Sequence, residues 1–342
     1  MADVTVMGAG AFGLSVAWAC AARGAKVRVI DPGGVGAGAS GGIVGALAPH
    51  VPENWNNKKA FQFDSLVMAE DFWARVEAAG GVSAGYGRTG RLQPVMDARG
   101  LDMARARTDT AATLWQGRFS WTVTDDPGDW APRSPTGHWI RDDLSARMHP
   151  RRACAALAAA IRARGGEIVA DGAADGAVVW ATGWRGLLEL SGDMGRPVGN
   201  GVKGQAALLH LDRPTAPQLF ADGLHIVPHA NGTVAVGSTS EREFDDPDTV
   251  DGQIDAVLAR AVEAVPALRG APVLERWAGV RPRAKSRAPM LGRHPLRGAE
   301  FIANGGFKVG FGMAPKVGEV MADLVLEGRD AVPEGFRPEA SL

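Results

Sequence analysis

Apolar positions in the first 31 residues form two short runs separated by a longer, alanine-rich one. The segment DVTVMGAG has apolar residues at 4, 6 and 7, Phe12 to Ala22 is rich in alanine, and GAKVRVID has apolar residues at 27, 29 and 30 before Asp31. Short apolar runs are typical of buried strands, and a long one that is closed by a glycine such as Gly24 is typical of a helix. The pattern predicts a strand–helix–strand unit over residues 3–31.

Apolar runs further along the chain predict additional elements of both kinds. The segment 82–143, by contrast, has many turn residues and only short strand-like pieces, and the segment 185–222 is also rich in turns. A strand, a glycine-rich turn and a helix are expected over 301–328. The other expected helices lie at 58–81, 150–165 and 250–264, and the other expected strands at 90–95, 119–124, 176–184 and 223–239, the last with a hairpin turn at 230–232.

This order predicts an α/β protein in which the chain leaves one domain and returns to it. A Rossmann-like nucleotide-binding domain is expected over 1–82, 145–196 and 276–342. The segments 83–144 and 197–275 are expected to form a second, α+β substrate-binding domain, which is built on an antiparallel sheet.

Composition narrows the classes of protein that fit. The 342 residues carry a net charge of −1 without a basic cluster, which disfavours nucleic acid without excluding it. Cys20 and Cys154 lack a CxxC spacing, so we expect no disulfide framework, no metal site and a reducing cytoplasm. The apolar start has three spaced glycines and no basic leader, so we expect neither a signal peptide nor a membrane span.

A glycine motif follows the first predicted strand. Gly8, Gly10 and Gly13 form G-x-G-x-x-G, in which glycines permit a tight turn, close approach to a pyrophosphate and close helix packing. The helix that begins there directs its positive end at the phosphates. Asp31 ends the next strand, where a carboxylate accepts hydrogen bonds from a ribose. The motif predicts a dinucleotide ligand and leaves flavin and nicotinamide open.

Several further motifs favour flavin, because in this order the chain resembles the FAD-dependent amine and amino-acid oxidases, which include glycine, D-amino-acid and sarcosine oxidases. The resemblance covers nearly the whole chain and implies a FAD-binding domain of the glutathione-reductase type. The motifs are GAGAFG (8–13), GASGGIVGALAPH (38–50), VVWATGW (178–184), VKGQ (202–205), IVPHANGTVAVGST (226–239), WAGVRPRAKSRAPMLGRHP (277–295) and GGFKVGFGMAPKVGE (305–319).

The resemblance also implies which residues hold FAD. Small residues at 39–42 would let backbone N–H groups reach the cofactor, and the glycine-rich backbone after 304 would meet the flavin. Covalent family members use a cysteine near the C-terminus, which this chain lacks after Cys154, so FAD is expected to be non-covalent. The shortened segment near 168–178 leaves the adenine contact unassigned. The expected cofactor residues are Gly8, Gly10, Ala11, Phe12, Gly13, Asp31, Ala39, Ser40, Gly41, Gly42, Thr182, Gly183, Gly305, Gly306, Phe307, Lys308, Gly310 and Met313.

Three residues are expected to act on the substrate. Arg281 matches the position that binds the substrate carboxylate in glycine-oxidase-like proteins, and its planar guanidinium suits that task. Lys308 falls where those proteins often carry a second arginine, and it would supply a point charge. His50 ends the 38–50 segment and is a candidate for the flavin edge; a structural role for it is equally open. Phe307 replaces a frequent tyrosine.

The resulting hypothesis is oxidation of a C–N bond. A small neutral amine or amino acid, of the glycine, sarcosine or D-amino-acid type, would give a hydride from its α-carbon to flavin N5, and O2 would take the electrons to form H2O2. The imine would hydrolyse to an oxo product and ammonia or an amine. Three alternatives stay open: an oxidase of a carboxymethylaminomethyl group on tRNA wobble uridine, a flavin dehydrogenase with another electron acceptor, and a non-catalytic nucleotide-binding module. Assembly into a homo-oligomer is also left open.

Overall fold

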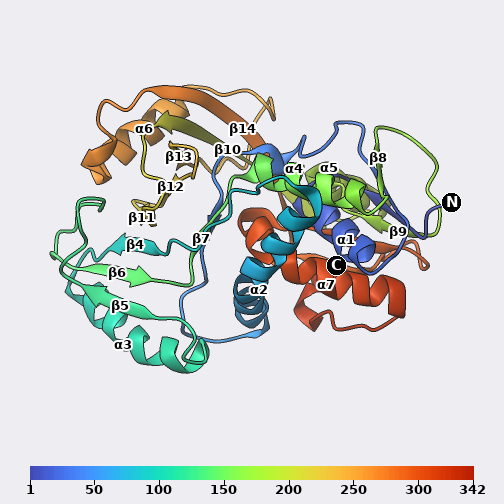
Figure 1. Ribbon diagram of the computed structural model, residues 1–342, viewed down its shortest axis with the longest axis horizontal. Coiled ribbons are helices and arrows are strands. Elements are labelled where there is room, and N and C mark those ends of the chain that lie inside the picture. The colour runs from blue at the N-terminus through green and yellow to red at the C-terminus, as the bar shows by residue number, and fades with distance from the viewer.

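Two large β-sheets lie side by side in the computed structural model, which describes residues 1–342 (Figure 1). A short pairing of β3 (Ala46–Leu47) with β7 (Ala146–Arg147) lies between them. The six-stranded sheet carries the N-terminal unit, and the eight-stranded sheet contains the long strands of the second half of the chain. The α/β fold class expected from the sequence is confirmed.

The six-stranded sheet is built around β1 (Val4–Met7). This strand pairs in parallel with β2 (Val27–Ile30) on one side and with β9 (Ala177–Trp180) on the other. Because the three strands are parallel, their carboxyl ends meet at one edge of the sheet, where α/β proteins bind ligands. The remaining strands, in order outward, are β8 (Glu167–Val169) beside β2, and β16 (Phe301–Asn304) and then antiparallel β15 (Met290–Arg293) beside β9.

Four helices pack against one another beside this sheet: α1 (Ala11–Ala22), α2 (Asn57–Gly80), α4 (Pro150–Ala163) and α7 (Gly310–Glu327). Every residue of α1 except Ala22 is buried, which explains why its sequence is apolar on all sides. Close contact between α1 and α7 depends on Gly318, because a Cβ there would lie 2.6 Å from the carbonyl oxygen of Ser15.

The eight-stranded sheet is dominated by β10 (Gly199–His210) and β14 (Val273–Ala284), which pair antiparallel along almost their full lengths. All its other pairings are antiparallel except the one between β11 and β4. Helix α6 (Gln253–Ala264) packs its buried residues on this sheet. Beyond β10, the strands follow in the order β13 (Thr233–Gly237), β12 (Leu224–Pro228), β11 (Gln218–Ala221), β4 (Arg91–Pro94), β6 (Trp139–Asp142) and β5 (Trp121–Thr124).

Two expectations about turn-rich segments were wrong. Helix α3 (Ala98–Leu114) lies within the segment expected to hold only turns and short strands, and it buries only Ala104 and Ala111, so its sequence shows no apolar face. The segment 185–222 holds most of α5 (Gly183–Asp193) and all of β10, whose glycines and polar residues obscure a strand that is nevertheless buried along most of its length. The predicted helices at 58–81, 150–165 and 250–264 correspond to α2, α4 and α6.

The expected domain boundaries remain a prediction. The strand β14 runs without a break through the expected boundary at 275/276 and joins the eight-stranded sheet over its whole length. No helix combines the length and the apolar character that are needed to cross a bilayer. The five short 3-10 turns are η1 (Ala39–Gly41), η2 (Pro266–Leu268), η3 (Phe307–Val309), η4 (Glu334–Phe336) and η5 (Pro338–Ser341).

Candidate cofactor and substrate site

The turn between β1 and α1 can be built only with glycine at two positions. Gly8 has a φ of +112°, and a Cβ on it would overlap the carbonyl oxygen of Ala181. A Cβ on Gly13 would overlap the carbonyl oxygen of Gly8 itself. Gly10 caps α1 without any side chain, so the first N–H groups of the helix face outward without a side-chain cap from that residue. Gly10 therefore leaves the helix N-terminus open to groups from elsewhere in the chain.

Asp31 lies beside this turn at the end of β2. Its Oδ2 accepts a hydrogen bond from the N–H of Ala9 at 2.7 Å, and its Oδ1 accepts one from the N–H of Gly33 at 2.9 Å. These two bonds fix the carboxylate next to the glycine turn. Each oxygen keeps a further lone pair that can accept a hydroxyl hydrogen.

The segment 38–50 passes over the start of α1, and several contacts with distant residues hold its first part in place. Ser40 Oγ accepts a hydrogen bond from the N–H of Ala11 at 2.9 Å. A Cβ on Gly42 would lie 3.1 Å from the ring of Trp277, so the backbone runs close to β14. Buried His229 holds the next residue, because its Nε2 lies 2.9 Å from the carbonyl oxygen of Ile43. Small residues are therefore needed here for close backbone contact.

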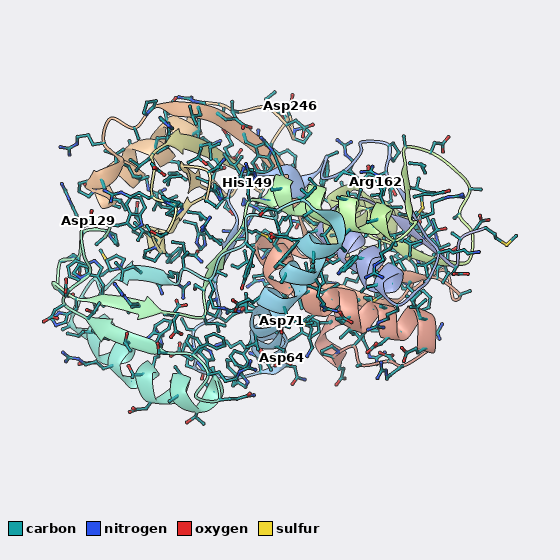
Figure 2. The ribbon with its side chains drawn as sticks, in the orientation of Figure 1. Asp64, Asp71, Asp129, His149, Arg162 and Asp246 are labelled. Atoms are coloured by element: carbon teal, nitrogen blue, oxygen red, sulfur yellow. The ribbon has the colours of Figure 1, made fainter.

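His229 stacks near His149, with ring centroids 4.8 Å apart. Figure 2 marks His149 at the start of α4, in the region where the two sheets meet. Burial is the main cause that lowers the pKa of both histidines, that of His229 to about 4. The imidazole of His229 is therefore neutral at pH 7, and a neutral ring that carries its proton on Nε2 can donate to Ile43. This supports a structural role for His229.

The glycine-rich segment after β16 approaches the same helix end. Gly305 has a φ of +74°, and a Cβ on Gly306 would lie 2.9 Å from the ring of Phe12 in α1. Asn304 organises this approach: its Nδ2 donates to the carbonyl oxygen of Gly183 at 3.0 Å, and its Oδ1 accepts from the N–H of Gly305 at 2.8 Å. Sequence reasoning missed Asn304, whose only signal was its place before two glycines.

Arg281 projects from β14 and is held by neighbouring strands. It donates to Ser238 Oγ at 2.8 Å and to the carbonyl oxygens of Thr239 at 2.8 Å and Lys203 at 3.1 Å. Its Nε is buried and has no partner. Burial lowers the pKa of Arg281 to about 10, so the side chain remains charged at neutral pH. The guanidinium is fixed in place, and its buried Nε–H is left without a partner in the protein.

The ring of Phe307 lies among three cations. Its centroid is 5.9 Å from Cζ of Arg281, 5.5 Å from Cζ of Arg283 and 5.8 Å from Nζ of Lys308. Desolvation, together with the charges of the two arginines, lowers the pKa of Lys308. Arg283 was not among the residues expected from the sequence, although it stands two positions after Arg281 and therefore on the same face of β14.

His50 is held by a side chain that sequence reasoning also missed. Gln62, buried in α2, accepts hydrogen bonds through its Oε1 from the backbone N–H of His50 at 2.8 Å and from its Nδ1. Gln62 Nε2 donates in turn to the carbonyl oxygen of Ala48 at 3.1 Å. Burial lowers the pKa of His50. With its proton on Nδ1, the neutral ring keeps Nε2 as a free acceptor.

The side chains of the expected residues do not all face this site. Met313 is fully buried in the largest hydrophobic cluster, so its side chain is a core group. Thr182 caps α5, and Gly183 at the start of that helix has a φ of +66°. Around β14, by contrast, the two cofactor segments come together, because the strand contacts both η1 (Ala39–Gly41) and η3 (Phe307–Val309).

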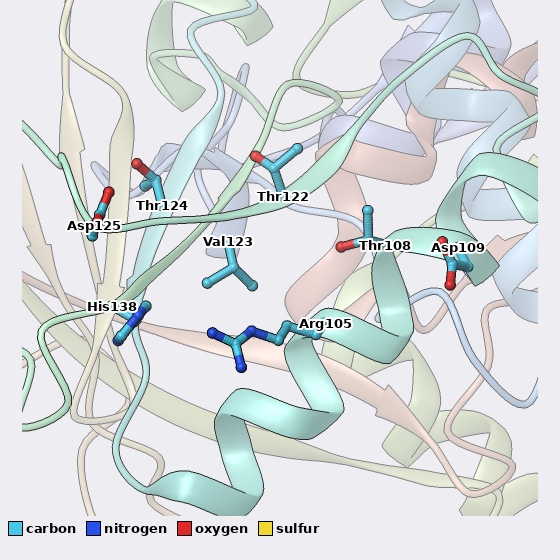
Figure 3. Close-up of a pocket in the computed structure, with 8 residues that line it drawn as sticks. All are labelled: Arg105, Thr108, Asp109, Thr122, Val123, Thr124, Asp125 and His138. Atoms are coloured by element: carbon cyan, nitrogen blue, oxygen red, sulfur yellow. The ribbon is translucent and has the colours of Figure 1, made fainter.

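A separate surface groove of about 570 Å³ lies between α3 and the strand β5. Figure 3 shows Arg105 and His138 on its walls, together with the threonines of α3 and β5. None of the residues expected to bind the cofactor or the substrate lines this groove. We therefore place the candidate site at the junction of β1, α1, β14 and η3, and not at this groove.

The comparison with known protein families decides between flavin and nicotinamide. Residues 3–324 match the model of the family described as DAO, FAD dependent oxidoreductase. The chain belongs to this FAD-dependent oxidoreductase family. Its cofactor is FAD, and it is an oxidoreductase, as expected from the sequence.

Similar members of the FAD-dependent oxidoreductase family are known over nearly the full length of the chain. Glycine oxidase of Pseudomonas putida is 28% identical over 99% of this chain and 99% of that protein. Glycine oxidase of Bacillus licheniformis is 25% identical over 95% of this chain and 93% of that protein. The crystal structure of glycine oxidase from Geobacillus kaustophilus superposes with a TM-score of 0.83 at 22% identity and covers 98% of both chains, which shows a shared fold.

The residues around the β1–α1 turn fit FAD. The N-terminus of α1, which no acidic residue occupies and whose first N–H donates to Ser40 Oγ, provides its next N–H groups and a positive dipole for a pyrophosphate. Asp31 is placed to accept ribose hydroxyls, and Ser40 borders the phosphate position. Gly305 and Gly306 let the backbone come close at the other end of the site. The individual contacts of these residues with FAD remain predictions of this geometry.

Proposed function

We propose that this FAD-dependent oxidoreductase oxidises the C–N bond of a small amine that carries a carboxylate, with O2 as the electron acceptor. The observation that carries the proposal is the position of Arg281, a fixed cation with an unpaired buried Nε on the strand that touches both cofactor segments. The names of the two glycine oxidases that match nearly the whole chain support the same class of substrate.

Arg281 and Lys308 would bind the substrate carboxylate. A charge-assisted hydrogen bond from Arg281 and the point charge of Lys308 would orient the substrate so that its α-carbon faces the flavin. FAD, when bound, accepts a hydride from the carbon next to nitrogen and passes the two electrons to O2, which is released as H2O2. Water then hydrolyses the imine to an oxo acid and ammonia or an amine.

The charges of the site favour the reactive form of the amine. Three cations surround Phe307, and like charges disfavour a protonated ammonium in the same space. His50 Nε2 is a free acceptor on a neutral ring, and it would take the hydrogen bond of the amine or of a water molecule. No acidic side chain is needed to remove a proton, because the cations already favour the neutral amine.

An anaerobic spectral titration tests this function. Purified protein with bound FAD is mixed with glycine, sarcosine, D-amino acids, L-amino acids, amines without a carboxylate, and tRNA, and the flavin absorbance is followed. Bleaching by amino acids and not by the carboxylate-free amines is expected. Bleaching by tRNA alone would favour the wobble-uridine alternative, and slow recovery of the colour in air would favour a dehydrogenase. No bleaching by any amine would overturn the proposal.

A further inference from the structure

The arrangement of the cations around Phe307 is unbalanced in charge. Arg281 and Arg283 lie on one face of β14, and Lys308 reaches the same ring from η3. An isolated β-bridge between Arg283 and Gly306 brings the two segments together. Phe307 itself has a φ of +43°, an unusual backbone conformation for a residue with a side chain.

Two of these three cations have no partner in the protein. Arg283 and Lys308 take part in no salt bridge and in no side-chain hydrogen bond, whereas Arg91 on the same sheet is paired with buried Asp142 at 2.9 Å. Glu241 offsets part of the charge of Arg281, and its carboxylate is shared with Lys203, which lies 3.9 Å away, and is held by Gln205 and Thr239.

Lys308 is exposed, and its Nζ lies over the Phe307 ring. Its charge is one of the causes that lower the pKa of His225 on β12, after burial and the charge of Arg91. The contacts of the three cations with Phe307 place the cluster between β14 and η3. One carboxylate bound to Arg281 would leave most of the positive charge of the cluster uncompensated. Unpaired like charges in a partly desolvated site repel each other.

We propose that Arg283 and Lys308 form a second anion subsite beside Arg281, and that the preferred substrate is an amine that carries two carboxylates. The proposal rests on the proposed function, because it assigns the first carboxylate to Arg281. The apolar ring of Phe307 lies against the carbon atoms that join the two carboxylates of the substrate. One carboxylate binds on the Arg281 side of the ring, and the other binds on the Arg283 side.

Binding of unreactive acids to the FAD-loaded protein tests the subsite without turnover. Perturbation of the flavin spectrum gives Kd values for the dicarboxylates malonate and succinate and for the monocarboxylates propionate and butyrate. In the wild type, the best dicarboxylate should bind at least about tenfold more tightly than the monocarboxylates. Arg283→Gln should abolish this preference and leave monocarboxylate binding within about threefold, and Arg283→Lys should keep part of it. Arg287→Gln, at an exposed arginine of the following turn, is the control.

The outcomes are distinct. Equal binding of both acid classes to the wild type, or equal weakening of both classes by Arg283→Gln, overturns the proposal. A shift in the flavin midpoint potential of Arg283→Gln with unchanged dicarboxylate binding would assign Arg283 to the cofactor and also overturns it. The ratio of flavin absorbance to protein absorbance shows whether Arg283→Gln has lost its FAD. If it has, the dicarboxylate preference of Arg283→Lys decides whether the subsite exists. If the dicarboxylate preference holds while no amine bleaches the flavin, the proposed function fails and the subsite stands.

Discussion

Ser40 Oγ lies 2.9 Å from the backbone nitrogen of Ala11 and accepts its hydrogen, so the 38–50 segment is attached to the first turn of α1. The two residues are 29 positions apart, and their hydrogen bond joins the glycine motif of residues 8–13 to the segment 38–50. The same N–H group belongs to the helix end that suits a pyrophosphate. Ser40 therefore connects the two halves of the cofactor site.

Ser40→Ala should weaken FAD binding by about 0.5–1.5 kcal/mol, or roughly threefold to tenfold in Kd, because one hydrogen bond at the helix end is lost. Isothermal titration of the apoprotein with FAD measures this change. Ser83→Ala, which removes a hydroxyl bound only to Glu77 and the N–H of Gly85, is the matched control. An unchanged Kd in Ser40→Ala would show that the hydroxyl does not serve the cofactor.

Gly13→Ala should lower the free energy of unfolding by about 1–3 kcal/mol and reduce the FAD content, because its Cβ would overlap the carbonyl oxygen of Gly8. Gly192→Ala is the control, since nothing lies within 4 Å of its Cβ position and it lies in helix α5. That control should leave stability unchanged or raise it by about 0.5–1 kcal/mol. Urea titrations of both variants give the comparison, and equal effects of the two changes would contradict it.

Arg281→Lys should raise the KM of a carboxylate substrate roughly tenfold or more, because lysine keeps the charge and loses the donors of the guanidinium. The carbonyl oxygens of Thr239 and Lys203 lose their donor as well, so the Tm is measured alongside the steady-state kinetics. Arg287→Lys, at an exposed position, should change neither quantity. A lower Tm with an unchanged KM would assign Arg281 a structural role only.

Protonation of His229 should contribute to acid unfolding. Its pKa is lowered from 6.5 to about 4 in the folded protein, mainly by burial, so the unfolded chain binds the extra proton between these pH values. Its contribution is fully present above pH 6.5 and is lost as the pH falls toward 4, by at most about 3 kcal/mol. Urea unfolding of the wild type and His229→Gln at pH 7.5 and 5 tests this. The variant should lose less stability between the two pH values, and an equal loss would contradict the assignment.

The parts of the fold that the sequence predicted correctly are those that depend on neighbouring residues. The strand–helix–strand unit over 3–31 could be predicted because Gly13 packs against Gly8 within that unit, and because α1 is buried on all sides. The hairpin around 230–232 likewise depends on adjacent strands, β12 and β13. Local patterns carry this information.

Other parts could not be predicted, because they depend on contacts between distant segments. Gln62 on α2 supports His50, and Asn304 on β16 joins Gly183 to Gly305, yet nothing near either amide in the sequence indicates a partner. Arg283 differs from a surface arginine only through its approach to Phe307, a residue that follows it by 24 positions. Helix α3 was missed for a different reason, since it covers its sheet with small and polar residues.

The order of strands in the six-stranded sheet has a consequence for synthesis on the ribosome. β1 emerges first, but its neighbour β9 follows only after residue 177, and β16 beyond it begins at residue 301. The amide of Asn304 and the start of α7 are needed to complete the flavin end of the site. The nascent chain therefore exposes its dinucleotide motif early and completes the pocket around it only after β16 and α7 have left the exit tunnel, so we expect FAD to be captured after these two elements emerge.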